Sequence, residues 1–492
     1  PVRREYNRWV ANQTLEDYAL RFTAKSARHF SSQRISQTAI GAISFLALEA
    51  IGGAITLSYG TTNAFYAIIV ASIAMLAIGL PISRYAIRHG VDIDLLTRGA
   101  GFGYIGSTIT TLIYASFTFM LFAIEASIMS GALELTLGIP LWIGYIISAV
   151  MVIPLVTHGV RLISKFQLMT QPFWIVLNIL PFIFIAFMDW GKFDLWRAFA
   201  GIRHASGPPG TVADFNLVEF GAASAVILAL MSQIGEQADF LRFLPPDPQR
   251  KWRHRLAIFL AGPGWVIIGA PKLLAGSFLV VLTFTSGVPV DRAADPAQMY
   301  LTAFGYMIPW HNAALLLMAA FVVVSQLKIN VMNAYAGSLA WSNFFSRLTH
   351  SHPGRVIWLV FNVAIALLLM ELGIYRLLEE TLGIFSIIAM AWLCTISADL
   401  FINKPLGLAP PGIEFKRAHL YDINPVGLGA MTLSATVSLI AHFGAFGEIA
   451  ASLAPYITLV IALIASPVIA WATKGKFYLA RKPRQSWKNL TN

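Results

Sequence analysis

The sequence contains little charge and almost no cysteine. Only 12% of its 492 residues are Asp, Glu, Lys or Arg, whereas 57% are hydrophobic. This balance excludes a soluble globular protein and predicts an integral membrane protein made of helices. The single cysteine, Cys394, lies in an apolar run. An internal disulfide and a cysteine-cluster metal site are therefore excluded.

Signals of targeting and catalysis are also missing. The first apolar run begins only near residue 38, so we expect no cleavable signal peptide. Gly101, Gly103 and Gly106 spell GxGxxG, but they open a membrane helix and do not follow a strand, so a dinucleotide site is not expected. The sequence predicts no catalytic residue, no certain metal site and no cofactor, and hence no enzymatic activity in these residues.

Basic residues exceed acidic ones, giving a net charge of +11. Most Lys and Arg fall in segments that alternate onto one side of the apolar runs. This distribution predicts topology, with the basic side in the cytoplasm, and not a nucleic-acid partner. We expect both termini to be cytoplasmic, as a basic lead-in (1–37) and a basic tail (473–492), with the protein in a bacterial inner (plasma) membrane.

The apolar runs predict twelve transmembrane helices, because each approaches the roughly 20 residues that a bilayer requires. Outer loops are expected near 189–216 and 286–310, the second with a short helix over the entrance. The predicted spans are 38–58, 63–86, 107–135, 139–157, 166–188, 217–241, 257–285 (kinked at Pro263 and Pro271), 311–337, 356–372, 381–402, 425–444 and 452–472.

Two of these spans carry polar interruptions. In Leu228–Pro245, LALMSQIGEQADFLRFLP, polar residues arrive within two turns, and Gly235 is the expected point of the break. In the first span, Glu49 precedes Gly52-Gly53. Repeats of five spans, 38–188 and 217–402, would each begin with a broken helix, with 425–472 appended. An odd number of spans inverts the second repeat, an architecture typical of secondary transporters.

Ionisable residues inside the spans are costly and so predict function. Glu125, alone in an apolar stretch, is the strongest candidate. Lys328 has two interpretations, a functional cation or a side chain that reaches the cytoplasmic interface. Glu49 and Glu236 either cap the breaks or contact a ligand. Aromatic residues of the third span are expected to pack in the core more readily than to stack on a ligand, namely Tyr114, Phe117, Phe119 and Phe122.

Four separated motifs resemble the nucleobase–cation symporter family, which includes purine, cytosine, allantoin and hydantoin permeases. They are RGAGFGYIG before the third span, QADFLRFLP closing the sixth, KINVMNAYAG in the eighth and YDINPVG at Tyr421–Gly427. The resemblance implies an all-α, five-plus-five inverted repeat of the LeuT type with helices 1 and 6 broken. It also implies alternating access and coupling to Na⁺ or H⁺.

The resemblance also implies site residues. The family's aromatic and glutamine of span 3 fall on Leu121 and Glu125, its stacking aromatic of span 6 on Leu230, and its asparagine of span 8 on Asn330. Of two sodium-binding hydroxyls, Ser325 remains. The expected ligand-binding residues are Glu125, Asn330, Leu121, Leu230, Phe122, Gln233 and Glu49, the coupling residues Ser325, Lys328, Glu125 and Glu236, and the gate residues Asp239 and Arg242, expected to form an ion pair.

The favoured function is cation-coupled uptake of a small nitrogenous ligand, such as a nucleobase-like heterocycle. A second resemblance competes, since REYNRWVANQTLEDYALRFT followed by SFLALEAIGGAI is similar to the membrane half of bacterial hybrid sensor histidine kinases. That reading predicts a ligand-sensing module joined to cytoplasmic kinase domains. A third alternative is a scaffold with a vestigial pocket. Uptake by the reconstituted protein distinguishes the transporter from the sensor, and failure of any ligand to stabilise the purified protein would favour the scaffold.

Overall fold

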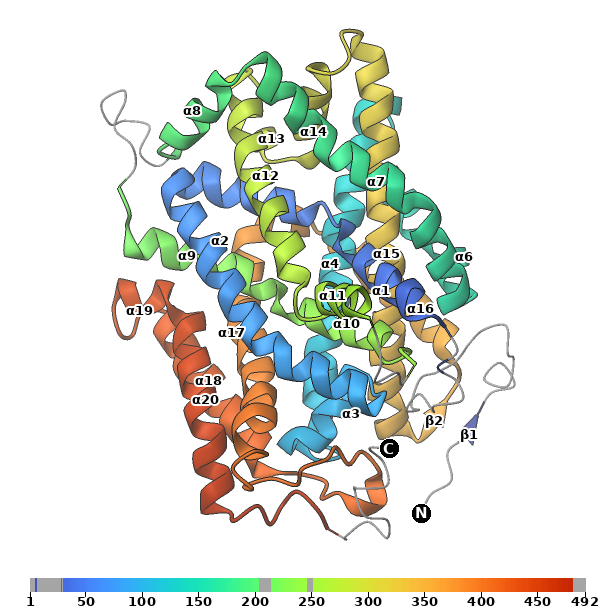
Figure 1. The fold of residues 1–492 in the computed structure, drawn as a ribbon, viewed down its shortest axis with the longest axis vertical. Coiled ribbons are helices and arrows are strands. Elements are labelled where there is room, and N and C mark those ends of the chain that lie inside the picture. The colour runs from blue at the N-terminus through green and yellow to red at the C-terminus, as the bar shows by residue number, and fades with distance from the viewer. Residues whose placement is uncertain (1–4, 7–27, 29, 203–213, 246–250, 481–492) are drawn as a thin grey trace.

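The computed structural model describes residues 5–6, 28, 30–202, 214–245 and 251–480, and these residues form a helical bundle (Figure 1). Within this described part, nine helices are long and apolar enough to cross a membrane. The chain is therefore an integral membrane protein. The predicted lead-in and tail lie largely outside the described residues. One short parallel pair joins β1 (Glu5–Tyr6) to β2 (Ser351–His352).

The first half of the bundle follows the predicted spans. The fourth span consists of two short helices, α5 and α6, so the count of twelve crossings stays a prediction. The elements are α1 (Ser32–Gly41), the 3₁₀ turn η4 (Ala42–Ser44), α2 (Ala47–His89), α3 (Ile93–Thr97), the π-helical turn η5 (Arg98–Phe102), α4 (Ser107–Leu137), α5 (Leu141–Val150), α6 (Val152–Thr157), α7 (Val160–Met188) and α8 (Gly191–Ala198).

The second half begins at α9 and ends with two appended helices, α18 and α20. Its elements are α9 (Leu217–Leu228), η7 (Ala229–Ser232), α10 (Gln233–Leu241), α11 (Trp252–Ala261), α12 (Trp265–Thr285), α13 (Val290–Ala293), α14 (Pro296–Gly305), α15 (His311–Thr349), α16 (Arg355–Glu371), η8 (Ile374–Leu377), α17 (Leu378–Ala398), the π-helical turn η9 (Asp399–Asn403), η10 (Arg417–His419), α18 (Pro425–His442), α19 (Glu448–Ser452) and α20 (Ala454–Ala472).

Span 1 is broken in the structure, and span 2 follows it after a sharp bend. Between α1 and α2 the chain leaves the helix at Phe45, whose backbone is extended (φ −61°, ψ 132°). Gly60 then divides α2 with φ 81° and ψ 163°. Glycine is required there because a Cβ would lie 2.7 Å from the carbonyl oxygen of Ala200.

Two predicted positions are wrong in detail, the break of span 6 at Gly235 and the start of span 7. Span 6 changes to a 3₁₀ turn at η7, before Gly235, and does not unfold. Gly235 lies inside α10, where the ring of Tyr114 occupies the space of a side chain. Span 7 begins at Trp265 and not at 257, because Pro263 lies in a turn that separates α11 from α12. Pro271 is inside α12, as predicted.

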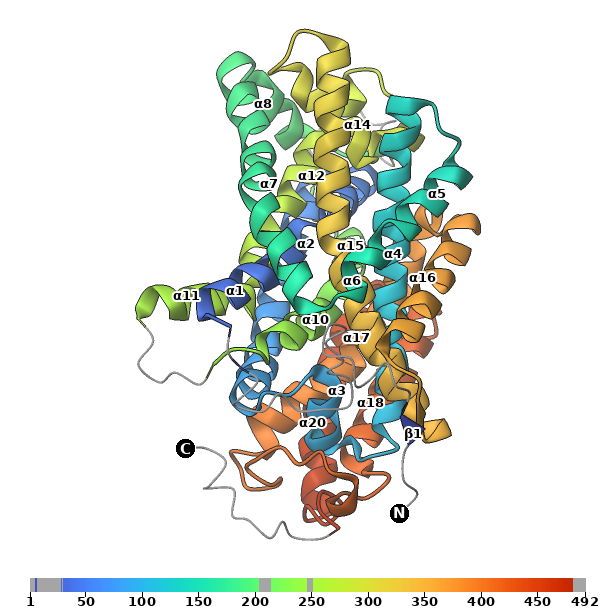
Figure 2. The ribbon, with the colours of Figure 1, turned by 90° about the vertical axis from the view of Figure 1, so that its right-hand side faces the viewer.

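The pairing of helices agrees with an inverted repeat. The third spans of the two halves, α4 and α15, pack against each other. Spans 1 and 6 pack antiparallel: α1, the first part of span 1, contacts α10, the last part of span 6, and α2 contacts α9. Figure 2 shows α1 beside α11 on the flank of the bundle, while α4 and α15 run through its centre. The two interrupted spans therefore face each other in the middle of the protein.

Gly52 and Gly53 do not form the break that the sequence predicted; Gly52 instead allows α2 to approach α12 closely. A Cβ on Gly52 would collide with the backbone carbonyl of Leu273. Small residues permit such backbone approach between membrane helices. Because backbone cannot move aside like a side chain, we expect Gly52→Ala to lower the free energy of unfolding by about 1–3 kcal/mol.

The matched control is Gly383→Ala in α17, where a Cβ meets nothing within 4 Å. Since alanine favours the helix over glycine, this variant should melt at or above the wild-type temperature. Thermal unfolding of the detergent-solubilised proteins followed by gel filtration measures both. Equal melting of the two variants would contradict close α2–α12 packing.

Candidate functional site

The centre of the candidate site is the start of α2, where the break of span 1 leaves backbone amides without helical partners. Ser44 stabilises the turn before it, because its hydroxyl donates to the carbonyls of Gly41 (2.8 Å) and Ser325 (3.3 Å). The amide of Leu46 donates to Oε1 of Gln326 at 3.4 Å. The break is thus held by side chains from other helices and not by its own sequence.

Glu125 accepts the next free amide. Its two carboxylate oxygens lie 3.2 and 3.3 Å from the backbone nitrogen of Ala47. Nε2 of Gln326 donates to Oε2 of Glu125 at 2.6 Å and to the carbonyl of Glu125 at 3.0 Å. A carboxylate at the N-terminal end of a helix is electrostatically favoured. Glu125 on α4 and Gln326 on α15 therefore clamp the break of span 1 from both repeats.

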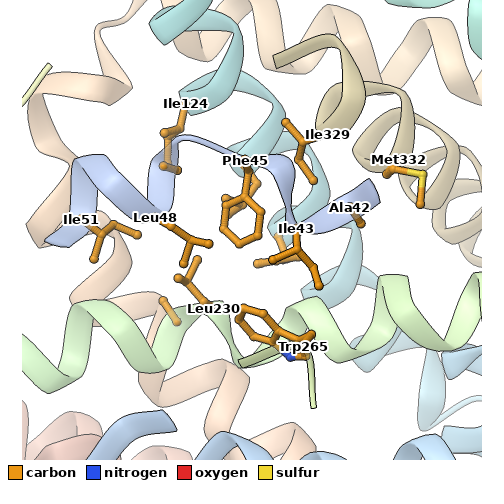
Figure 3. Close-up of a cluster of buried hydrophobic side chains, with 14 of the residues drawn as sticks. Ala42, Ile43, Phe45, Leu48, Ile51, Ile124, Leu230, Trp265, Ile329 and Met332 are labelled. Atoms are coloured by element: carbon orange, nitrogen blue, oxygen red, sulfur yellow. The ribbon is translucent and has the colours of Figure 1, made fainter. Parts of the chain in front are cut away.

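Apolar side chains cluster at the break of span 1, where Phe45 lies close to Leu230 and Trp265 (Figure 3). The ring of Phe45 lies 6.3 Å from that of Trp265, and Leu230 lies in the same cluster. The predicted stacking positions, Leu121 and Leu230, are both buried and aliphatic. Phe45 and Trp265, which the sequence analysis did not select, supply the aromatic faces at the site.

Span 8 presents several of the predicted residues along one helix. Asn330 donates to the carbonyl of Phe122 (3.4 Å) and accepts from Asn333 (3.2 Å). This places Asn330 and Phe122 at the α4–α15 contact, one turn from the Glu125 clamp. Ser325 is buried beside the break, and its hydroxyl has no hydrogen-bond partner among the described residues.

Lys328 does not extend to the membrane interface, so that interpretation is wrong. The side chain is fully buried and points to α7. Its ammonium donates to both oxygens of Gln167 (backbone 3.1 Å, side chain 2.7 Å), to Thr170 (3.2 Å) and to Gln171 (2.9 Å). Neutral oxygens from one turn of α7 therefore hold this cation, which offsets part of its desolvation cost.

Glu49 does not cap the break, because its carboxylate points to α12. Oε1 accepts from Lys272 at 2.8 Å and from the Tyr300 hydroxyl at 3.1 Å. The pair is buried, with Glu49 at 0% and Lys272 at 5% exposure. Glu49 therefore ties α2 to α12, and Glu125 performs the capping role that the sequence left open for Glu49.

Glu236 is bonded within its own helix. Its Oε2 accepts from Nε2 of Gln233 at 3.0 Å, and its Oε1 has no partner among the described residues. Both side chains are buried in the first turn of α10, directly after η7. The structure thus places Gln233 and Glu236 beside the interruption of span 6.

The predicted ion pair of Asp239 with Arg242 is wrong. Arg242 forms its ion pair with Asp92 at 3.1 Å and reaches Asp239 only at its backbone carbonyl. The carboxylate of Asp239 accepts from the Tyr114 hydroxyl at 2.8 Å. Beside them, Asp94 accepts from Arg98, Arg347 and Thr111. These residues, which we call the inner cluster, join α3 to α4, α10 and α15 (Figure 1).

The GxGxxG segment has a structural role. Gly103 has φ 81°, and a Cβ on it would lie 2.8 Å from the carbonyl oxygen of Tyr421. The amides of Tyr104 and Ile105 donate to the carbonyls of Tyr421 (3.0 Å) and Asp422 (2.7 Å). The first and last of the four sequence motifs therefore contact each other, which explains the glycines without a bound nucleotide.

Sequence reasoning missed Gln326, Trp265, Asp92 and Asp94. Gln326 lies in the polar run SQLKIN that also supplied Ser325 and Lys328. A polar side chain inside a predicted span was a usable signal, because a polar group in the bilayer must be satisfied within the protein. Asp92 and Asp94 lie in a loop on the predicted cytoplasmic side, where nothing in the sequence separates a buried carboxylate from a solvated one.

The sequence matches no family profile and no curated protein, but solved structures are similar over nearly the whole chain. Mhp1, a nucleobase-cation-symport-1 family transporter, in a closed conformation with bromovinylhydantoin bound, aligns with TM-score 0.65 at 14% identity, covering 94% of this chain and 96% of that one. The chain has the nucleobase–cation symporter fold.

Two further structures share this fold. The inward facing conformation of Mhp1 gives a TM-score of 0.64 at 16% identity, covering 90% of this chain and 91% of that one. A Na⁺-coupled sialic acid symporter in a substrate-bound outward-open state gives 0.59 at 14% identity, with 94% of each chain covered. The LeuT-type architecture predicted from the sequence is confirmed. These neighbours are transporters, and they lend no support to the sensor-kinase alternative.

Proposed function

We propose that this protein is a secondary transporter that carries a small polar, nitrogenous ligand across the membrane by alternating access, coupled to a cation. The observation that carries the proposal is the break of span 1 in the protein interior, where backbone amides donate to the side chains of Glu125 and Gln326 and not to their own helix. Exposed peptide groups between interrupted helices are where such transporters bind their ligands and ions. Similar structures in closed, inward facing and outward-open states support alternating access.

The ligand would bind where the clamp meets the apolar cluster. Glu125 and Asn330 provide hydrogen-bonding groups on α4 and α15, and Phe45 and Trp265 provide aromatic surface beside Leu230. Such a site suits a flat, nitrogen-containing molecule with donor groups for the carboxylate. Leu121, Phe122, Gln233 and Glu49 complete the set expected from the sequence, with Glu49 acting through the position of α2.

The coupling ion is proposed to be a proton carried by Glu125. Protonation removes the negative charge that attracts the amide of Ala47, and so weakens the hold of α4 on α2. Lys328 places a basic group in the interior, held by oxygens of α7. Na⁺ is the alternative ion, with Ser325 beside the break as a ligand. Glu236 is the second carboxylate that would exchange a proton.

The inner cluster is proposed as the gate on the cytoplasmic side, with Asp239 and Arg242 as members. We expect Asp94→Asn to open this end, because the substitution leaves Arg98 and Arg347 without their shared carboxylate. In a Cys394→Ala background with Ser342→Cys, buried on α15, maleimide labelling should become several-fold faster.

Asp189→Asn is the control, since Asp189 and Lys192 form an exposed pair at 3.9 Å. Its labelling rate should equal that of the parent. If Asp94→Asn leaves the labelling rate unchanged while the protein stays folded, the inner cluster is not the gate.

The transport proposal is tested with the purified protein in proteoliposomes that contain a pH-sensitive dye. Purines, cytosine, allantoin and hydantoins are added one by one, under an inward proton gradient or an inward sodium gradient. We expect at least one of these solutes to accumulate and to acidify the lumen. Accumulation that follows sodium alone would assign Na⁺ as the coupling ion, and binding of a solute without accumulation would refute transport.

A further inference from the structure

A groove of about 680 Å³ lies between α7 and α12, with Ile40 of α1 and Lys272 of α12 in its lining. Figures 1 and 2 show α8 at one end of these two helices. The groove opens on the lipid-facing side of α7, where Ile175, Ile179 and Ile183 are 42%, 55% and 44% exposed. Its volume is in the range that accommodates a small molecule.

Two hydrogen-bond donors of α7 line this groove without a partner in the described part of the chain. The indole nitrogen of Trp174, whose side chain is only 5% exposed, has no acceptor among the described residues. Nδ2 of Asn178 is also buried and without an acceptor in the same part of the chain. A buried donor without a partner is destabilising, and native proteins rarely retain one without a reason. Positions i and i+4 place Trp174 and Asn178 on one face of α7, about 6 Å apart along the helix axis.

The charged groups at the groove already neutralise each other, which favours a neutral ligand. Lys272 lines the groove, but its ammonium is already paired with Glu49 at 2.8 Å and lies 5.4 Å from the centre of the Trp174 ring. An added anion would be buried in the membrane with no net countercharge, which is costly. A neutral acceptor with two oxygens at opposite edges satisfies both donors without that cost.

Apart from Gln171, whose Oε1 accepts from Lys328, the remaining walls are apolar and aromatic. Phe182 and Phe278 face each other with ring centres 5.9 Å apart, and Phe193 of α8 stacks on Phe278 at 4.4 Å. These rings continue from Asn178 towards α8, so the groove is polar near its inner end and apolar along the rest. Such walls fit a flat ring and an attached apolar chain.

We propose that this groove binds a neutral, membrane-soluble molecule with a flat carbonyl-bearing ring and an apolar tail, which is the chemistry of a prenylquinone. The two ring carbonyls accept hydrogen bonds from Trp174 and Asn178, and the tail lies along Ile179, Phe182 and Phe278 towards α8. The site is separate from the proposed transport site and does not depend on it. The bound molecule would contact Lys272, whose ion pair with Glu49 connects the groove to α2.

Binding is measured by tryptophan quenching with decylubiquinone, using the full chain in nanodiscs. The wild type should show saturable quenching. Asn178→Leu removes one donor and should weaken binding several-fold. Trp174→Phe removes the other donor and should also weaken binding several-fold, which quenching of the remaining tryptophans, Trp196 of the groove among them, reports. Ile179→Trp fills the groove and should prevent binding. The control is Ile73→Trp in α2, where the native side chain is 62% exposed, and this variant should bind the quinone like the wild type.

Two results would overturn the proposal. Quenching that does not saturate, or that is equal in wild type, Asn178→Leu and Ile179→Trp, means that the quinone only dissolves in the bilayer. Displacement of the quinone by oleate at equal concentration means that the groove accepts any lipid chain, charged or neutral. Far-ultraviolet circular dichroism and melting temperature establish that each variant is folded, and Asn178→Leu decides the matter if Trp174→Phe does not fold.

Discussion

Replacing Glu125 by glutamine is expected to abolish the dependence of uptake on an inward proton gradient. The isosteric side chain still accepts the amide of Ala47, but it neither carries a charge nor exchanges a proton. A hydrogen bond to a charged group contributes about 1.5–3 kcal/mol, so losing the charged state should reduce coupled uptake about ten- to a hundredfold. The measurement is initial uptake into proteoliposomes at several external pH values.

Glu134→Gln is the matched control, since it makes the same change on the same helix, about two and a half turns away from the clamp. It should keep the wild-type pH profile. A Glu125→Gln protein whose uptake still rises with the proton gradient would remove Glu125 from the coupling mechanism. Unfolding of this variant in detergent would instead assign Glu125 a structural role at the break.

Lys272→Met should cause the largest loss of stability of any variant considered. It leaves the carboxylate of Glu49 buried without its cation, and breaking a buried ion pair from one side costs about 3–5 kcal/mol. Thermal or denaturant unfolding of the solubilised protein measures this loss. The fall should be visible without any ligand, because the pair connects α2 and α12.

The double variant Glu49→Gln with Lys272→Met separates charge from packing. Removing both charges together should recover most of the lost stability, since well-packed neutral groups replace a desolvated pair. Lys192→Met disrupts an exposed pair and should change stability by at most about 1 kcal/mol. If the double variant is as unstable as Lys272→Met, the Glu49–Lys272 contact stabilises the protein through packing and not through charge.

The fold was predictable from the sequence because a bilayer imposes strong and simple constraints. Each span must be apolar over its length, and basic loops remain on one side. The run 217–241 became α9, η7 and α10 at the same boundaries, and the polar residues inside it marked the interruption. The break of span 1 was predicted in the right span, but its position was set by Gln326 and Glu125 and not by Gly52-Gly53.

The sequence by itself therefore determined that the chain lies in a membrane, that spans 1 and 6 are interrupted, and that Glu125 is a candidate for function. Only the tertiary structure decided which group each charge meets: Glu49 with Lys272, Arg242 with Asp92, Lys328 with Gln167. The physical reason is distance along the chain. Spacing within a helix fixes neighbours three or four residues away. These partners lie on different helices, and helix packing alone brings them together.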